Sequence, residues 1–162
     1  MAYQKLQVSR ALEVIPSDTV NIPDPASEYI SSTSTGASAG QLVDTSVNFE
    51  EKGVKVGDIV YADLAGAPIA AYVTALEDAD NINVSTEIPS GKDYKIYRAT
   101  EFPNNGCVLY VGAAGDVIVL TAGGDLIEFE GVLAGTYHPV NVLRVNATGH
   151  TTAAATKIIA LW

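Results

Sequence analysis

Apolar and polar residues alternate along the chain in short bursts, and turn-forming residues separate one burst from the next. The bursts are rich in Val, Ile, Thr and Tyr, as is typical of β-strands. No stretch shows a convincing helical period, and only residues 46–53 leave room for a turn or two of helix. The alternation predicts strands at Asp58–Asp63, Ala71–Leu76, Asn81–Thr86, Tyr94–Arg98, Cys107–Val111, Asp116–Thr121, Leu126–Glu130, Tyr137–Asn146 and Lys157–Trp162.

Short strands that follow one another at about 8–12 residues are typical of all-β sandwiches and barrels. We therefore predict an all-β fold, with an antiparallel β-sandwich or barrel-like domain. Asn105-Gly106 and Gly123-Gly124 are strong hairpin signals, because the primed turns of tight hairpins need positive φ angles. The last third of the chain is accordingly expected to be a meander of antiparallel strands.

Changes of composition divide the chain into three parts. Residues 1–27 carry Pro16, Pro23 and Pro25, which favour an extended N-terminal arm, and they also contain the first part of the terminal β-domain. Residues 28–100 are predicted to be a second, small β module, which begins with a Ser/Thr/Gly/Ala-rich connector over residues 28–40. Residues 101–162 form the remainder of the terminal β-domain, so the small module is an insertion.

Charge narrows the range of functions. The chain of 162 residues has 9 Lys and Arg against 19 Asp and Glu, which gives a net charge of −10. Binding to phosphates needs an excess of positive charge, so we expect no nucleic-acid partner. Charged residues make up only 17% of the chain, below the roughly 25% of ordinary globular proteins. So few charges indicate that a partner covers part of the surface.

Membrane association and disulfides are not expected either. No apolar run reaches the about 18 residues of a membrane span, and the first ten residues lack the apolar segment of a secretory signal. A single cysteine, Cys107, excludes an internal disulfide and a Cys-rich zinc site. Because Cys107 opens an apolar strand, we expect its thiol to be buried and inert.

The C-terminal block contains a characteristic series of stretches, which includes residues 107–112, 115–117, 121–125, 132–136 and 144–149 and ends with Ile159-Ala160-Leu161-Trp162. In these stretches the block resembles a protein family of tailed bacteriophages known as spike base proteins. In that family a Pro-Ser-Asp-Thr segment lies just before the first strand. Here Pro16-Ser17-Asp18-Thr19 lies far upstream of Cys107, which fits an insertion between two halves of one small domain.

The inserted block contains Leu42-Val43-Asp44, Asn48-Phe49, residues 53–61 and Tyr94-Lys95-Ile96-Tyr97. In these stretches it resembles a module found in virion proteins of marine and cyanobacterial phages. Together the two resemblances imply a component of a cyanophage-like bacteriophage virion that is not an enzyme. They carry no functional residues over to this chain.

Candidate catalytic groups are few. The serines lack the Gly-x-Ser-x-Gly elbow of hydrolases. His138 is expected at the start of a strand and His150 in an exposed turn, without a motif around either. Glu128 and Glu130 lie two apart and so share one strand face, where a pair of glycosidase carboxylates could not flank a sugar. We therefore predict no catalytic residues.

A cation site is the remaining chemical possibility. Glu77-Asp78-Ala79-Asp80-Asn81 is a short acidic turn between two strands. Hard cations such as Ca²⁺ bind oxygen ligands in such turns, but the Gly and the distal Glu of an EF-hand loop are missing. The alternative is a turn whose side chains cap their own backbone. We predict no metal site and no cofactor.

Protein–protein contact is the function that these observations favour. Trp162 follows an apolar run and would be costly to expose, so it is expected in the core or in a neighbouring subunit. We predict interface residues at Pro16, Pro23, Pro25, Tyr110, Leu161 and Trp162. The expected protein is a capsid decoration or cement protein or a spike-base component, made in the host cytoplasm and located in the virion. Its expected partners are copies of itself, with a trimer as the expected homo-oligomer, and other phage virion proteins.

The alternative is a host-glycan-binding attachment module of the virion. The chain has 8 Tyr, and Tyr is favoured at surfaces where one end of the side chain is buried and the other is wet. A glycan-binding module predicts exposed Tyr or Trp beside Asp and Asn on one face. Ordinary strand propensity explains the same tyrosines without a ligand.

Overall fold

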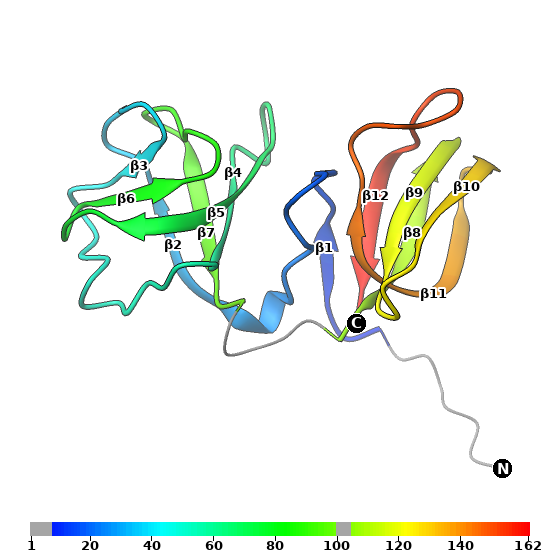
Figure 1. Ribbon diagram of the computed structural model, residues 1–162, viewed down its shortest axis with the longest axis horizontal. Helices are drawn as coiled ribbons and strands as arrows, with labels where there is room; N and C mark the ends of the chain where they lie inside the picture. The colour runs from blue at the N-terminus through cyan, green and yellow to red at the C-terminus, as the bar shows by residue number, and fades with distance from the viewer. Residues whose placement is uncertain (1–7, 100–104) are drawn as a thin grey trace, which may run out of the picture. The chain divides into compact units, whose positions relative to one another are not determined.

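The computed structural model describes residues 8–99 and 105–162, and these form two compact units (Figure 1). Unit 1 comprises Met1–Ile22 with Asn105–Trp162, and unit 2 comprises Pro23–Asn104. The predicted all-β fold is confirmed, because each unit contains one antiparallel sheet of six strands. The boundary predicted after residue 100 falls outside the described residues.

The sheet of unit 1 has the strand order β1-β12-β8-β11-β9-β10. Its members are β1 (Ala11–Glu13), β8 (Cys107–Ala113), β9 (Gly115–Thr121), β10 (Leu126–Val132), β11 (Thr136–Val145) and β12 (Thr156–Leu161). Every neighbouring pair of strands is antiparallel. β1 and β10 are therefore the two edges of this sheet.

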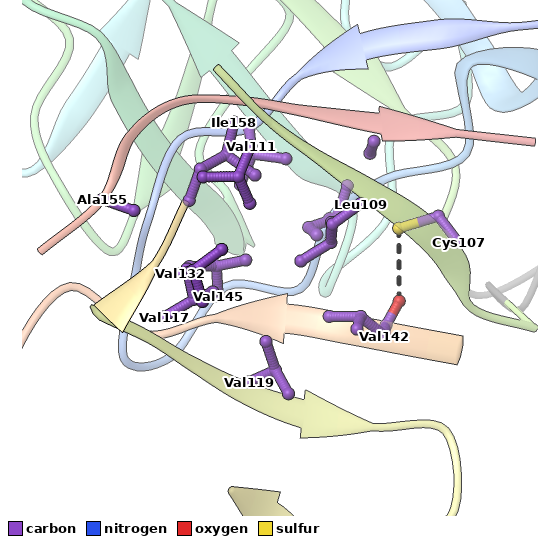
Figure 2. Close-up of a cluster of buried hydrophobic side chains, with 13 residues drawn as sticks. Cys107, Leu109, Val111, Val117, Val119, Val132, Val142, Val145, Ala155 and Ile158 are labelled. Atoms are coloured by element: carbon purple, nitrogen blue, oxygen red, sulfur yellow. Dashed lines mark hydrogen bonds between the residues drawn. The ribbon is translucent and has the colours of Figure 1, made fainter. Parts of the chain in front are cut away.

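Alternate residues of these strands form the core of unit 1. Cys107, Leu109 and Val111 of β8 point to the same side and pack with Val142 of β11 and Ile158 of β12 (Figure 2). The Cys107 thiol donates to the carbonyl of Val142 at 3.3 Å. Burial is thus the direct result of the period-two pattern in the sequence.

One close approach inside this sheet requires a glycine. A Cβ atom on Gly112 would lie 2.8 Å from the carbonyl oxygen of Lys157. Lys157 lies opposite Gly112 between two regular pairs of the β8–β12 ladder and has a φ of 55°. The missing side chain therefore lets β12 run close against β8 at this point.

The N-terminal segment is extended, but it packs on its own unit. Val14 and Ile22 belong to the core of unit 1, and their backbone N–H groups donate to Ile158 and Leu143 at 2.9 and 2.8 Å. Val14 and Ile22 thus lie in unit 1, whereas Pro23 and Pro25 lie in unit 2, and an arm that binds another protein stays a prediction. Residues 1–7 lie outside the described residues. Pro25–Ser27 form the short 3₁₀ helix η1 of unit 2, for which Asp24 is the N-cap.

The sheet of unit 2 has the strand order β2-β7-β4-β5-β6-β3. Its members are β2 (Glu28–Thr33), β3 (Gln41–Val43), β4 (Ile59–Ala62), β5 (Ile69–Leu76), β6 (Asn81–Val84) and β7 (Asp93–Tyr97). Just beyond β2, the N–H of Thr35 donates to the carbonyl of Val43 at 2.9 Å. The two ends of the strand order therefore meet, and the sheet is barrel-like.

One local prediction for unit 2 is corrected by this sheet. Residues 28–40 are not only a connector, because Glu28–Thr33 form β2 and pair with β7. Residues 46–53 form successive turns, with no helix. Their one large apolar side chain, Phe49, is fully buried in the core of unit 2, so packing rather than helix propensity fixes this segment.

Candidate functional site

The most exposed large apolar side chains of unit 1 lie on β10, on β11 and in the turn between them. Leu126 is 59% exposed, Leu133 is 72% exposed and Tyr137 is 58% exposed, and Ile127 is exposed as well. The ring of Tyr137 contacts that of Tyr110 on β8, with centroids 5.1 Å apart. We call Tyr110, Leu133 and Tyr137 the Tyr137 surface. Leu133 precedes Tyr137 by four residues in the chain, and exposed apolar residues that form a patch are typical of protein-binding surfaces.

The second feature of this region is the free edge of β10. β10 pairs with β9 and is the last strand in the order of its sheet. We call Leu126–Glu130 the β10 edge. It has no Pro or Lys, the residues that commonly prevent an edge strand from pairing with another chain.

The loop before β12 is fixed by two carboxylates rather than by a ligand. Asp116 accepts from the N–H and the hydroxyl of Thr152, each at 2.7 Å, and from the N–H of Gly131 at 2.9 Å. Glu128 accepts from the N–H and the hydroxyl of Thr151 at 2.7 and 2.8 Å. The hydroxyl of Thr152, followed by the backbone donors, lowers the pKa of Asp116. These bonds hold the loop against β9 and β10.

The predicted interface residues lie at separate places. Pro16 is exposed, Pro23 is buried and Pro25 is half-buried at the start of η1. Tyr110 and Leu161 are half-buried on β8 and β12. Trp162 is half-buried against the core of unit 1, and its N–H donates to the carbonyl of Arg10 at 3.0 Å. Of the six, Tyr110 is the one that belongs to the Tyr137 surface, where its ring contacts that of Tyr137. The interface role of all six stays a prediction.

The histidines show no catalytic arrangement in the described residues. The ring of His138 packs on Phe129, with centroids 5.0 Å apart, and its Nε2 is buried without a hydrogen-bond partner in the described structure. His150 lies close enough to Asp116 to contribute to its lowered pKa. The Cys107 thiol is buried, and this burial raises its pKa to about 12, as expected of an inert thiol.

The acidic turn at residues 77–81 binds its own amide groups. The Asp78 carboxylate accepts from the N–H of Asp80 and the side-chain amide of Asn81, each at 2.8 Å. Glu77 accepts from the side-chain amide of Asn83 at 2.8 Å. Across residues 8–99 and 105–162, no group of three or more His, Cys, Asp or Glu side chains could hold a metal ion.

Unit 2 has two shallow hollows that share Ser31. One, of about 300 Å³, is lined by Tyr61, Asp63, Lys92 and Lys95 among others. The Nζ of Lys92 lies 2.9 Å from the Asp63 carboxylate, so its charge is already paired. The other hollow, of about 520 Å³, is lined by Tyr29, Ser46, Asn48 and Glu51 among others.

Few tyrosines could stack on a ligand. Tyr61, Tyr94 and Tyr97 are buried, and the two most exposed described tyrosines, Tyr72 and Tyr137, lie in different units. Tyr29 lines the larger hollow, and the guanidinium of Arg98 lies 4.2 Å from the centroid of its ring. One face of Tyr29 is therefore already covered.

Sequence reasoning missed the exposed part of β10. It treated Leu126–Glu130 as an ordinary half-buried strand with Glu128 and Glu130 on the solvent face. The adjacent pair Leu126-Ile127 was the available signal, because two consecutive apolar residues of a half-buried strand cannot both face the core.

Comparisons of the chain with protein-family models, curated proteins and solved structures find no match. In the described part of the chain, no helix has the length and apolar character needed to cross a membrane.

Proposed function

We propose that this chain is a structural protein of a bacteriophage virion, a capsid decoration or cement protein or a spike-base component, that acts by binding other proteins. The observation that carries the proposal is the Tyr137 surface. Leu133 and Tyr137 are 72% and 58% exposed, the first in the turn before β11 and the second on β11. Covering such side chains with a partner removes apolar area from water, which stabilises a complex.

Sequence and charge support the same proposal. The C-terminal stretches that resemble spike base proteins, residues 107–149, include the strands that carry the Tyr137 surface. The net charge of −10 keeps the free protein soluble before it assembles. In this proposal the protein is made in the host cytoplasm, forms a homo-oligomer with a trimer as the expected state, and binds other virion proteins.

The experiment that tests this function is protein mass spectrometry on gradient-purified particles of the phage that encodes the chain. Peptides of this chain should co-sediment with the major capsid or tail proteins at a constant ratio across the particle peak. A washed sample of infected-cell debris from the same lysate serves as the control. Absence of the chain from intact particles, with presence in the infected cells, would contradict the proposal.

A host-glycan-binding module is the second candidate, and the larger hollow of unit 2 is the observation that favours it. Its lining of Tyr29, Ser46, Asn48 and Glu51 offers hydroxyl, amide and carboxylate groups to a sugar. A glycan array with the full chain tests this candidate. Sugar binding that is lost in Asn48→Ala, and kept in Tyr137→Ala, would favour attachment over assembly.

A further inference from the structure

We propose that the β10 edge (Leu126–Glu130) is a docking site for an extended strand of another protein, in which basic residues alternate with apolar ones. The inference rests on the assembly function proposed above and specifies the chemistry of the partner. It follows from three features of the edge, namely its free backbone groups, the faces of its side chains and its charge.

The first feature is the set of backbone groups that point away from β9. The N–H of Thr121 donates to the carbonyl of Asp125 at 2.8 Å, and the β9–β10 register continues without a shift from Leu126 to Phe129. In an antiparallel ladder the bonded residues alternate, so Ile127 and Phe129 bond to β9. Leu126 and Glu128 therefore direct their N–H and C=O groups outward, where a further strand can pair with them, and Glu130 follows at the point where the register shifts.

The second feature is the arrangement of side chains on the two faces of β10. Phe129 packs against the core of unit 1, so Ile127 lies on this inner face and Leu126, Glu128 and Glu130 lie on the outer face. Opposite residues of paired strands lie on the same face. An antiparallel partner thus places apolar residues opposite Phe129, Ile127 and Leu126, and two other residues opposite Glu130 and Glu128.

The third feature is charge, which selects the partner. The β9–β10 hairpin contains Asp116, Asp125, Glu128 and Glu130, and the chain has no Lys or Arg between Arg98 and Arg144. Opposite charges across a strand pair stabilise the pair, and like charges destabilise it. The residues opposite Glu130 and Glu128 are therefore Lys or Arg, and the segment reads basic, apolar, basic, apolar, apolar from its N-terminus.

In two registers a second copy of this chain fits the edge less well. Antiparallel self-pairing centred on Glu128 places Glu128 opposite itself, and pairing centred on Phe129 places Glu128 opposite Glu130. Both registers set like charges against each other, and each chain already has a net charge of −10. Strand addition by a basic segment has no such penalty and uses the recognition mode of other exposed sheet edges.

The test uses the full-length chain and the synthetic peptide acetyl-TKVKVLT-amide, with acetyl-TEVEVLT-amide as the charge control. Titration followed by amide chemical shifts should place the perturbed N–H groups at Leu126 and Glu128. The basic peptide should bind at least about ten-fold more tightly than the acidic one at low salt, and more weakly as salt rises. Methylating the backbone nitrogens of the peptide that face β10 should abolish binding, and this part of the experiment leaves the protein unchanged.

A charge exchange completes the test. Glu130→Lys should weaken binding of the basic peptide and strengthen binding of the acidic peptide, each by a factor of about 3–10. The control is Glu87→Lys in unit 2, which makes the same charge change at an exposed site and should alter the binding of neither peptide. Equal binding of both peptides, or perturbed amide chemical shifts at residues outside β10 instead of within it, would overturn the proposal. So would self-association that protects these amides without peptide. A chain that is absent from particles but still selects the basic peptide would refute the virion function alone.

Discussion

The carboxylate of Asp116 accepts hydrogen bonds from both the backbone N–H and the hydroxyl of Thr152, each at 2.7 Å. The two residues lie 36 positions apart in the sequence, at the start of β9 and in the loop before β12. Because Asp116 also accepts from the N–H of Gly131 in β10, this one carboxylate joins three segments of unit 1 next to the proposed docking edge.

Removing the charge of Asp116 should destabilise the protein in a pH-dependent way. The hydrogen bond from the Thr152 hydroxyl is the largest cause that lowers the pKa of Asp116 below 3.8. A lowered folded-state pKa stabilises the fold above the unfolded pKa, and this contribution is lost as pH falls through the folded value. Urea denaturation of wild type and Asp116→Asn should therefore show a gap in the free energy of unfolding at neutral pH, and this gap should narrow as the pH falls below 3.8. Asp125→Asn, at the exposed hairpin turn, is the control, and a gap independent of pH contradicts this role.

Tyr94→Phe should destabilise unit 2 by about 1–3 kcal/mol, because it removes a donor from a buried carboxylate. The Tyr94 hydroxyl donates to Asp44 at 2.8 Å, and Asp44 is fully buried. Burial alone would raise the pKa of Asp44, but hydrogen bonds from Ser32, Ser46 and Tyr94 outweigh it and lower this pKa. Chemical denaturation measures the loss. Tyr72→Phe, at an exposed tyrosine, should be neutral, and equal effects of both variants would show that the bond is unimportant.

Trp162→Ala should lower the free energy of unfolding by about 2 kcal/mol. This loss is smaller than that for a fully buried Trp, because the side chain of Trp162 is half-exposed. Trp162 packs on the core of unit 1, and its carbonyl accepts from the N–H of Ser9 at 2.7 Å. Thermal and urea unfolding at two protein concentrations measure the effect. Leu133→Ala, at a more exposed position, should change stability little at low concentration. A neutral Trp162→Ala would mean that this packing is not stabilising.

The Cys107 thiol should not react with Ellman's reagent in the native protein. Its pKa is raised to about 12 by burial, so very little thiolate, the reactive form, exists at neutral pH. One equivalent should react after unfolding in guanidinium chloride. Rapid native labelling, with no change in circular dichroism, would show that Cys107 is accessible.

The alternation of apolar residues was sufficient to predict the strands that bury one regular face. Leu109 and Val111 of β8, and Val117 and Val119 of β9, follow the period of two and lie in the core. β2 was not predicted as a strand, because Ser31, Ser32 and Thr33 have the composition of a connector. Its pairing with Asp93–Tyr97 of β7 is a long-range property that local composition does not carry.

The candidate surfaces were predictable only in part. Tyr110 was identified, but Leu126, Leu133 and Tyr137 were not, and the exposure of Leu126 depends on β10 being an edge of the sheet. Strand order decides this, and the order is set by pairings between distant segments such as β1 with β12. The apolar character of a residue alone does not reveal whether a sheet covers it.

The measurement that tests the assembly account most directly is the mass of the purified chain by light scattering, over a range of concentrations. The account predicts a defined oligomer, with three times 16.9 kDa as the expected mass. Tyr137→Asp should shift it toward the monomer. Val56→Asp should not, although Val56 is equally exposed at 57% in unit 2. A monomer at every concentration, or an oligomer that Tyr137→Asp leaves intact, would contradict self-assembly through the Tyr137 surface.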